Sequence, residues 1–303
     1  MWQALAGYAV RGPTQAALLS FSTLLLSLFM PPLVIVSNAL VALVWLRLGP
    51  VSGAVSVGIA LVAATVIAAF AGNPLAPVAL MMSFWLPVIV MAMVLRTTVS
   101  LNLALLAGAT LALAGVLITY LLVDEPSESW RGLLDAVTQA AEQSTSGAGT
   151  DRRRVTEWLN NAGQWMTGFS AATQFILAAL SLLLARVWQA RLFNPGGLQK
   201  EFHSLRFGQA AGAAGLLIVL ASVMLQSEIL TNLAIVVIVA FAFQGLAVLH
   251  ALLAQTRLQV ASLVGVYVFL LLFSPTSVKI IGLLGLADTW LDIRNRLKFT
   301  KKD

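Results

Sequence analysis

Long apolar runs, separated by prolines and arginines, fill the first part of the chain, and each run is typical of a membrane-spanning helix. A helix needs about 20 apolar residues to cross the hydrocarbon of a bilayer. Only Met30-Pro31-Pro32 separates the first two runs, which are short, so the pattern predicts a tight hairpin there. Five runs precede the first acidic residue, and they cover about 14–30, 32–47, 52–72, 76–95 and 99–123.

Four further apolar runs follow in the second half of the chain. They cover about 164–185, 208–226, 229–252 and 258–273. The segment Ser274-Pro275-Thr276-Ser277 then breaks the pattern, and the apolar piece 278–291 is too short to span comfortably. The predicted fold is therefore all-α, a polytopic transmembrane helix bundle of about nine spans plus a short terminal half-helix.

The apolar pattern also predicts a domain organisation of four consecutive parts. These are a front transmembrane bundle of five helices (1–123), an outer-face insert (124–163), a rear transmembrane bundle (164–292) and a basic cytoplasmic tail (293–303). In the insert, Trp130, Leu133 and Leu134 recur at helical spacing among polar residues, which predicts an amphipathic helix. A basic connector, Arg186–Arg206, is expected to separate the sixth span from the seventh.

Composition and charge place the protein in a membrane and set its orientation. Of the 303 residues, 59% are hydrophobic and only 10% are charged, against about 25% charged in soluble domains. The net charge of +6 does not indicate nucleic-acid binding, because the basic residues stand at the ends of apolar runs. Placing both termini in the cytoplasm puts nearly all short basic loops on the cytoplasmic side, as expected for a bacterial inner-membrane protein.

Candidate catalytic and metal-binding groups are scarce. The chain has no cysteine, and its two histidines, His203 and His250, are far apart in sequence. It contains no phosphate-binding P-loop, no GxSxG and no HExxH motif. The sequence therefore predicts no enzymatic activity, no cofactor and no metal.

Five polar side chains within the predicted spans are the candidate ligand-binding residues. They are Asn38, Asn102, Gln174, Asn232 and Gln244. Intramembrane polar groups often mark a functional site. The alternative interpretation, which we favour for any single one of them, is a structural hydrogen bond between helices, worth about 0.6 kcal/mol.

Several charged residues at the predicted membrane boundaries are candidates for contact with an ion or a partner. Glu228, at an outer turn, is interpreted as a solvated turn residue or as a cation or proton site. Asp288 and Asp292 are one helical turn apart near the inner boundary, with Arg294 beside them, and Arg296 stands four residues after Asp292. These carboxylates either bind a cation or the basic connector, or they form ion pairs with their own helix end.

The basic connector and the helix after it are candidates for contact with a partner protein. Arg206, in the connector, is a further charged residue that we expect to contact an ion or a partner. The stretch Gly208–Gly212 is a GxxxG motif, whose small residues allow another helix to approach closely. That helix belongs either to a partner or to the same bundle.

Two stretches, KEFHSLRFG in the connector and GLADTWLDIRNR near the end, resemble the YybS-like family of uncharacterised bacterial membrane proteins. Gly285, Asp288 and Arg294 fit the glycine, aspartate and arginine that this family has near a last short helix. More distantly, the helices rich in small residues are similar to the substrate-binding subunits of energy-coupling-factor transporters, which have fewer spans. The first resemblance implies a membrane location and no mechanism.

Two functions fit these observations. The first, which we favour, is a small-molecule carrier or substrate-binding transport component without its own ATPase, with a cavity lined by Asn38, Asn102 or Gln244. The alternative is a membrane scaffold that binds partner proteins through its basic cytoplasmic face. The expected partners are the lipid bilayer, a small-molecule ligand, and a membrane protein or a second copy of the chain, with no nucleic acid.

Overall fold

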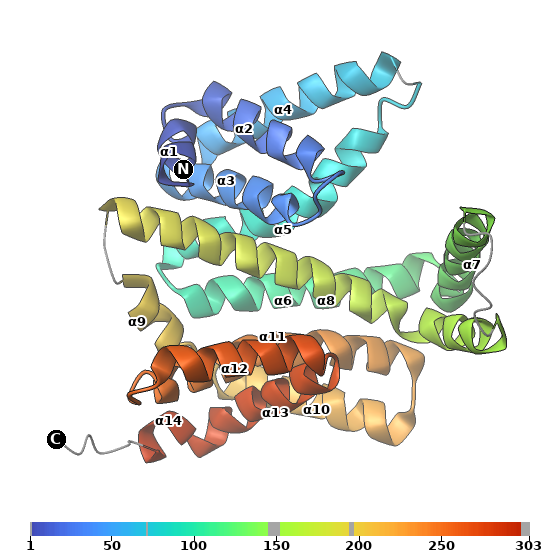
Figure 1. The fold of residues 1–303 in the computed structure, drawn as a ribbon, viewed down its shortest axis with the longest axis vertical. Coiled ribbons are helices and arrows are strands. Elements are labelled where there is room, and N and C mark those ends of the chain that lie inside the picture. The colour runs from blue at the N-terminus through green and yellow to red at the C-terminus, as the bar shows by residue number, and fades with distance from the viewer. Residues whose placement is uncertain (1, 71, 145–151, 194–196, 298–303) are drawn as a thin grey trace. The chain divides into compact units, whose positions relative to one another are not determined.

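The structure is a computed structural model that describes residues 2–70, 72–144, 152–193 and 197–297. Within these ranges the chain forms fourteen helices and no strand (Figure 1), which confirms the all-α prediction. Residues 298–303 of the predicted cytoplasmic tail lie outside the described residues. The prediction of four consecutive domains stays a prediction.

The helices are as follows: α1 (Trp2–Ala9), α2 (Pro13–Leu26), α3 (Leu33–Arg47), α4 (Pro50–Phe70), α5 (Ala76–Thr98), α6 (Leu101–Leu122), α7 (Pro126–Ser144), α8 (Arg152–Phe193), α9 (Gly197–His203), α10 (Gln209–Leu225), α11 (Glu228–Leu253), α12 (Gln259–Leu272), α13 (Thr276–Leu291) and α14 (Ile293–Arg296).

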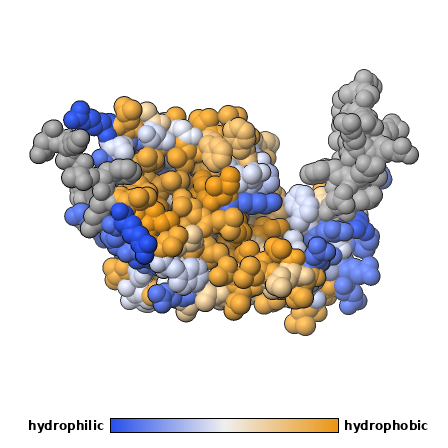
Figure 2. All heavy atoms as spheres, turned by 90° about the horizontal axis from the view of Figure 1, so that it is seen from below, coloured by the Kyte–Doolittle hydropathy of each residue, from blue (hydrophilic) through white to orange (hydrophobic). Residues whose placement is uncertain are grey.

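Each of the nine predicted spans corresponds to an apolar helix, and the protein is a membrane helix bundle. Within the described ranges, α4, α5, α6, the Ala162–Arg191 part of α8, and α11 are long and apolar enough to cross a bilayer. The helices α2, α3, α10 and α12 are apolar but shorter. Hydrophobic residues cover most of the face in Figure 2, where most strongly hydrophilic residues gather at the left and right margins.

The predicted boundary between the sixth span and the basic connector is wrong. Helix α8 does not end near residue 185 but continues through Arg186 and Arg191 to Phe193, so it has 42 residues. A helix of that length extends about 63 Å, roughly twice the hydrocarbon thickness. Helix-forming residues continue past the apolar run, so the helix continues to Phe193, two residues before Pro195 in the sequence.

The described chain divides into two compact units. Unit 1 consists of 1–108, 174–207 and 247–255, and unit 2 consists of 109–173, 208–246 and 256–303. Each unit therefore combines segments that are far apart in the sequence.

Helix α3 is the core of unit 1. It packs against α1, α2, α4 and α5, and every residue from Val36 to Val44 is buried. Ser37 Oγ donates a hydrogen bond to the backbone oxygen of Ser20 on α2 (2.7 Å) and accepts one from Trp85 Nε1 on α5 (3.2 Å). The contact of α2 with α3 confirms the predicted hairpin.

Unit 2 contains a very close contact between α11 and α13. A Cβ atom added to Gly285 would lie 2.0 Å from the backbone oxygen of Phe241, and one added to Gly245 would lie 2.0 Å from that of Ile281. A Cβ atom added to Gly282 would lie 2.4 Å from the backbone oxygen of Ile238. The terminal half-helix α13 thus packs backbone against backbone on α11, because glycine occupies each point of contact.

We expect Gly285→Ala to destabilise the protein by about 1–3 kcal/mol, because the added methyl group overlaps backbone atoms that cannot move aside. Thermal unfolding of the purified protein in detergent would measure the loss. The matched control is Gly265→Ala in α12, where an added Cβ meets no atom within 4 Å. Equal unfolding temperatures for the two variants would contradict the close packing.

Candidate functional site

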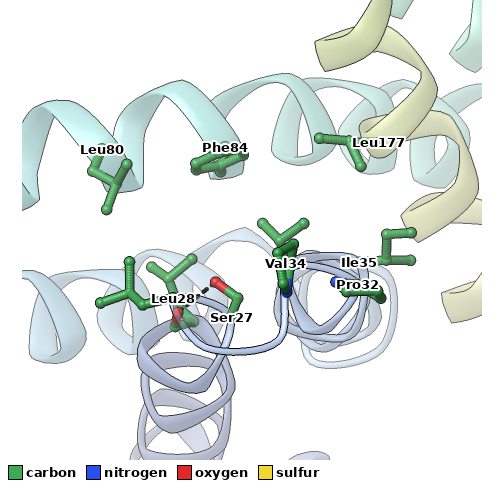
Figure 3. A pocket seen from close by; sticks show the side chains of 10 residues that line it. Ser27, Leu28, Pro32, Val34, Ile35, Leu80, Phe84 and Leu177 are labelled. Atoms are coloured by element: carbon green, nitrogen blue, oxygen red, sulfur yellow. Dashed lines mark hydrogen bonds between the residues drawn. The ribbon is translucent and has the colours of Figure 1, made fainter. Parts of the chain in front are cut away.

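A cavity of about 550 Å³, open to the surface of the unit, lies in unit 1, where the turn between α2 and α3 faces α5 and α8 (Figure 3). The lining residues are Leu24, Ser27, Leu28, Pro31, Pro32, Val34, Ile35, Leu80, Phe84 and Leu177. Leu80 and Phe84 of α5 and Leu177 of α8 lie opposite the turn and form the other wall.

The surface of this cavity is apolar. Ser27 is the one lining residue with a polar side chain, and its hydroxyl donates to the backbone oxygen of Leu24 (2.6 Å). No lining residue carries a charge. The cavity therefore favours hydrocarbon. It is not the polar cavity expected from the sequence, since none of the five predicted ligand-binding residues lines it.

Asn38 lies on α3, about one helical turn after Val34 and Ile35, which line the cavity. Its side chain is 1% exposed, and among the described residues its Oδ1 has no hydrogen-bond partner. Such a buried, unpaired acceptor is uncommon, because burial removes it from water without replacing the lost hydrogen bond.

Asn232, by contrast, is the centre of a hydrogen-bonded cluster in unit 2. Its Nδ2, which carries two hydrogens, lies within hydrogen-bond distance of three acceptors: Tyr120 Oη (2.9 Å), the backbone oxygen of Gln164 (2.7 Å) and that of Glu228 (2.8 Å). Its Oδ1 accepts from the backbone nitrogen of Gly168. Tyr120 in turn donates to Glu228 Oε1 (2.8 Å). Asn232 thus joins α6, α8 and α11.

The same part of α8 also holds the insert helix α7. Trp130 Nε1 donates to Thr167 Oγ1 (2.9 Å), and a Cβ added to Gly163 would lie 2.7 Å from the backbone oxygen of Ser127. The predicted amphipathic helix is therefore present, and its first turns are packed against α8.

Gln244 and Asp288 stabilise the end of the chain in unit 2. Gln244 Nε2 donates to the backbone oxygen of Gly285 (2.8 Å) and to Thr289 Oγ1 (3.3 Å), which joins α11 to α13. Asp288 is fully buried, and its Oδ2 forms an ion pair with Arg294 Nη2 (2.9 Å). Asp288 Oδ1 accepts from the backbone nitrogen of Ile293 (2.9 Å). This carboxylate caps α14.

The sequence predicts one helix that carries Asp288, Asp292 and Arg296 on one face, but in the structure this helix is interrupted at Asp292. Helix α13 ends at Leu291, and Asp292 adopts a left-handed conformation with φ 48°. The ion pair of Asp288 is therefore with Arg294, six residues along the chain. Cation binding by these carboxylates stays a prediction.

Other predicted contact residues lie in unit 1. Asn102 Oδ1 accepts a hydrogen bond from the backbone nitrogen of Arg206 (3.3 Å), which fixes the start of α6 to the segment after α9. Arg186 forms an ion pair with Glu201, so the predicted connector is held by its own charges. Gln174 is half-buried in α8. Ligand binding by Asn102 and Gln174 stays a prediction.

The glycines of the GxxxG stretch are used inside unit 2. A Cβ added to Gly212 would lie 2.7 Å from Thr289 Cγ2, and one added to Gly215 would lie 2.9 Å from Phe241 Cε2. Gly212 therefore permits the contact of α10 with α13. Of the two interpretations offered by the sequence, packing within the bundle is the one that these contacts support.

The cavity-lining residues and Tyr120 were missed at the sequence level. Apolar side chains in an apolar helix give no signal of a cavity, and only the break at Pro31-Pro32 between two short runs marks the place. Among the described residues, no group of three or more histidine, aspartate or glutamate side chains is placed to hold a metal ion.

We expect Asn232→Leu to lower the unfolding temperature more than Tyr120→Phe. The first variant removes the hydrogen bonds of a buried amide to Tyr120, Gln164 and Gly168, each worth about 0.5–1.5 kcal/mol, whereas the second removes only one hydroxyl. Differential scanning fluorimetry in one detergent would compare them. A Tyr120→Phe loss as large as that of Asn232→Leu would show that Asn232 is not the centre of the cluster.

Comparison with known proteins supports the membrane assignment. No curated protein and no solved structure matches the chain. The family described as predicted membrane protein (DUF2232) matches residues 18–289, most of the chain. That match includes the α2–α3 cavity, the Asn232 cluster and the buried Asp288. The protein is a multi-pass membrane protein that belongs to the DUF2232 family.

Proposed function

We propose that this membrane protein is a transport component that binds a small apolar molecule within the bilayer, without an ATPase or catalytic activity of its own. The observation that carries this proposal is the 550 Å³ cavity of unit 1, whose lining is hydrocarbon apart from one internally bonded serine hydroxyl. Water gains no hydrogen bonds in such a cavity, so an apolar molecule that enters it replaces poorly bonded solvent or a lipid chain.

The hydrogen bonds of the predicted polar residues also favour an apolar ligand over a polar one. The amides of Asn232 and Gln244 are occupied by neighbouring helices, and binding a polar ligand through them would first require breaking those bonds. Asn102 is likewise bonded to the backbone of Arg206. Their role in this proposal is structural.

A scaffold that binds other proteins is the alternative function. It is supported by Arg191 and Lys200, which are exposed near the end of α8 and on α9. It loses support from Gly212 and Gly215, since these glycines already contact helices of the same unit. The resemblance to the YybS-like family does not distinguish the two functions.

The proposed location is the bacterial inner membrane, with both termini in the cytoplasm. The support is the distribution of basic residues, which favours the cytoplasmic side for the loops at Arg47, Arg96 and Arg257. In this orientation the α2–α3 turn that borders the cavity lies at the outer surface, and α9 lies at the inner one.

We expect Leu80→Trp to reduce labelling of the protein by a photoreactive long-chain alcohol severalfold, because the indole fills part of the cavity. Mass spectrometry after irradiation would locate and quantify the label. The matched control is Leu220→Trp on α10, since Leu220 and Leu80 are similarly exposed, at 48% and 42%. Labelling that is weak in wild type, or that both variants reduce equally, would refute the cavity as a binding site.

The proposed orientation can be tested directly because the chain contains no cysteine. We expect Ser129→Cys in α7 to react with a membrane-impermeant maleimide in intact spheroplasts, and Ser204→Cys, after α9, to react only when the membrane is permeabilised. Both serines are exposed. The reverse pattern of labelling would invert the topology.

A further inference from the structure

Two hydrogen bonds fix the heights of α3 and α5 relative to each other within unit 1. Arg96 Nη1 donates to the backbone oxygens of Trp45 (3.1 Å) and Leu46 (2.8 Å), so the ends of the two helices are level. Further along, Trp85 Nε1 donates to Ser37 Oγ, so the helices run side by side in the same direction. Positions along both helices can therefore be measured from the level of the Arg96 guanidinium.

The cavity lies at the depth of the bilayer hydrocarbon. At 1.5 Å per residue, the lining residues Phe84 and Leu80 are about 18 and 24 Å along α5 from Arg96. Val34 is about 17 Å along α3 from Trp45. An arginine at the end of a spanning helix extends its charge to the headgroups. Because the hydrocarbon is about 30 Å thick, the cavity lining lies about 6–13 Å below the headgroups of the opposite leaflet.

The α2–α3 hairpin is also shorter than its neighbour α4. Only Leu48 and Gly49 connect the end of α3 to the start of α4, so the two helices share one level there. Helix α3 has 15 residues and extends about 22 Å, whereas α4 has 21 residues and extends about 31 Å. The α2–α3 turn therefore stops about 9 Å short of the far end of α4. At the hairpin, the outer surface of the protein lies below the surface of the bilayer.

The side chains at the turn bordering the cavity are apolar and exposed. Leu28, Phe29 and Met30 are 67%, 86% and 62% exposed. Between Arg47 and Arg96 the sequence has no charged residue. Consecutive apolar side chains exposed to water would oppose folding, whereas lipid solvates them without this cost. Together with its depth, this apolar rim indicates that the cavity opens into lipid.

We propose that the cavity of unit 1 takes a hydrocarbon chain of a membrane lipid, which enters laterally from the leaflet opposite Arg96. At the depth of the cavity, the middle of the chain lies beside Leu80 and Phe84, and the headgroup stays at the bilayer surface. No lining residue carries a charge, so the chain and not the headgroup is recognised. This inference rests on the proposed function and names its ligand as a lipid of the bilayer.

The test is photolabelling of the purified full-length protein in phosphatidylethanolamine nanodiscs. The probe is phosphatidylglycerol with a diazirine in one acyl chain, present as a minor component, and mass spectrometry quantifies the label on each helix. We expect a diazirine at the middle of the chain to label α5 around Leu80 and Phe84 severalfold more than α10 around Leu220. A diazirine beside the headgroup should not show this excess. The same mid-chain probe on phosphatidylethanolamine should label α5 equally well.

Leu220 is the reference because it matches Leu80 in exposure and lies at a similar depth. It is 48% exposed, against 42% for Leu80, and is about 17 Å along α10 from the start of that helix, which follows Arg206 closely. Leu80→Trp should abolish the excess label on α5, because the indole fills part of the cavity. Leu220→Trp should leave that excess unchanged. The comparison of probe depths in wild type needs no variant, so it decides the question even if Leu80→Trp does not fold.

The outcomes separate this inference from the proposed function. If the photoreactive long-chain alcohol labels the cavity but the mid-chain phospholipid probe labels α5 no more than α10, the proposed function stands and a lipid chain is refuted as its ligand. An equal excess from the mid-chain and the headgroup-proximal probes would also refute the inference, since the chain would not lie at the predicted depth. If neither the alcohol nor the phospholipid labels the cavity, the proposed function itself fails.

Discussion

Lipid offers no hydrogen-bond partner, and this constraint governs how the protein is built. Every polar group within an apolar helix must be paired by the protein itself or remain unpaired at a cost. Asn232 and Gln244 join their helices to neighbours, and Asp288 is paired with Arg294 and with the backbone of Ile293. These polar residues therefore act as specific connections in a bundle whose apolar contacts alone are poorly directional.

Asn38 departs from this rule, since its buried Oδ1 has no hydrogen-bond partner among the described residues. An unpaired buried acceptor is uncommon in folded proteins, because burial removes it from water without replacing the lost hydrogen bond. Asn38 is not among the residues that line the cavity of unit 1.

The residues of the candidate site were only partly predictable from the sequence. Asn38 was identified from the sequence because an asparagine in an apolar run is conspicuous. Asn232 and Gln244 were identified on the same ground, but their amides are bonded to other helices. Nothing local distinguishes the three residues. The difference depends on which side chains from distant parts of the chain face each one, and that is a property of the packed bundle.

The sequence by itself determined the class of the protein and the places of its helices. Apolar runs of membrane-spanning length must form helices in lipid, because only a helix satisfies all its backbone groups within one segment. Tertiary structure alone decided how the helices meet. The glycines at 245, 282 and 285 are ordinary small residues in the sequence, but they become a backbone contact only when α13 lies on α11. The cavity exists only because the α2–α3 turn faces α5 and α8. Packing depends on shape complementarity between segments that are far apart along the chain, and hydropathy carries no record of it.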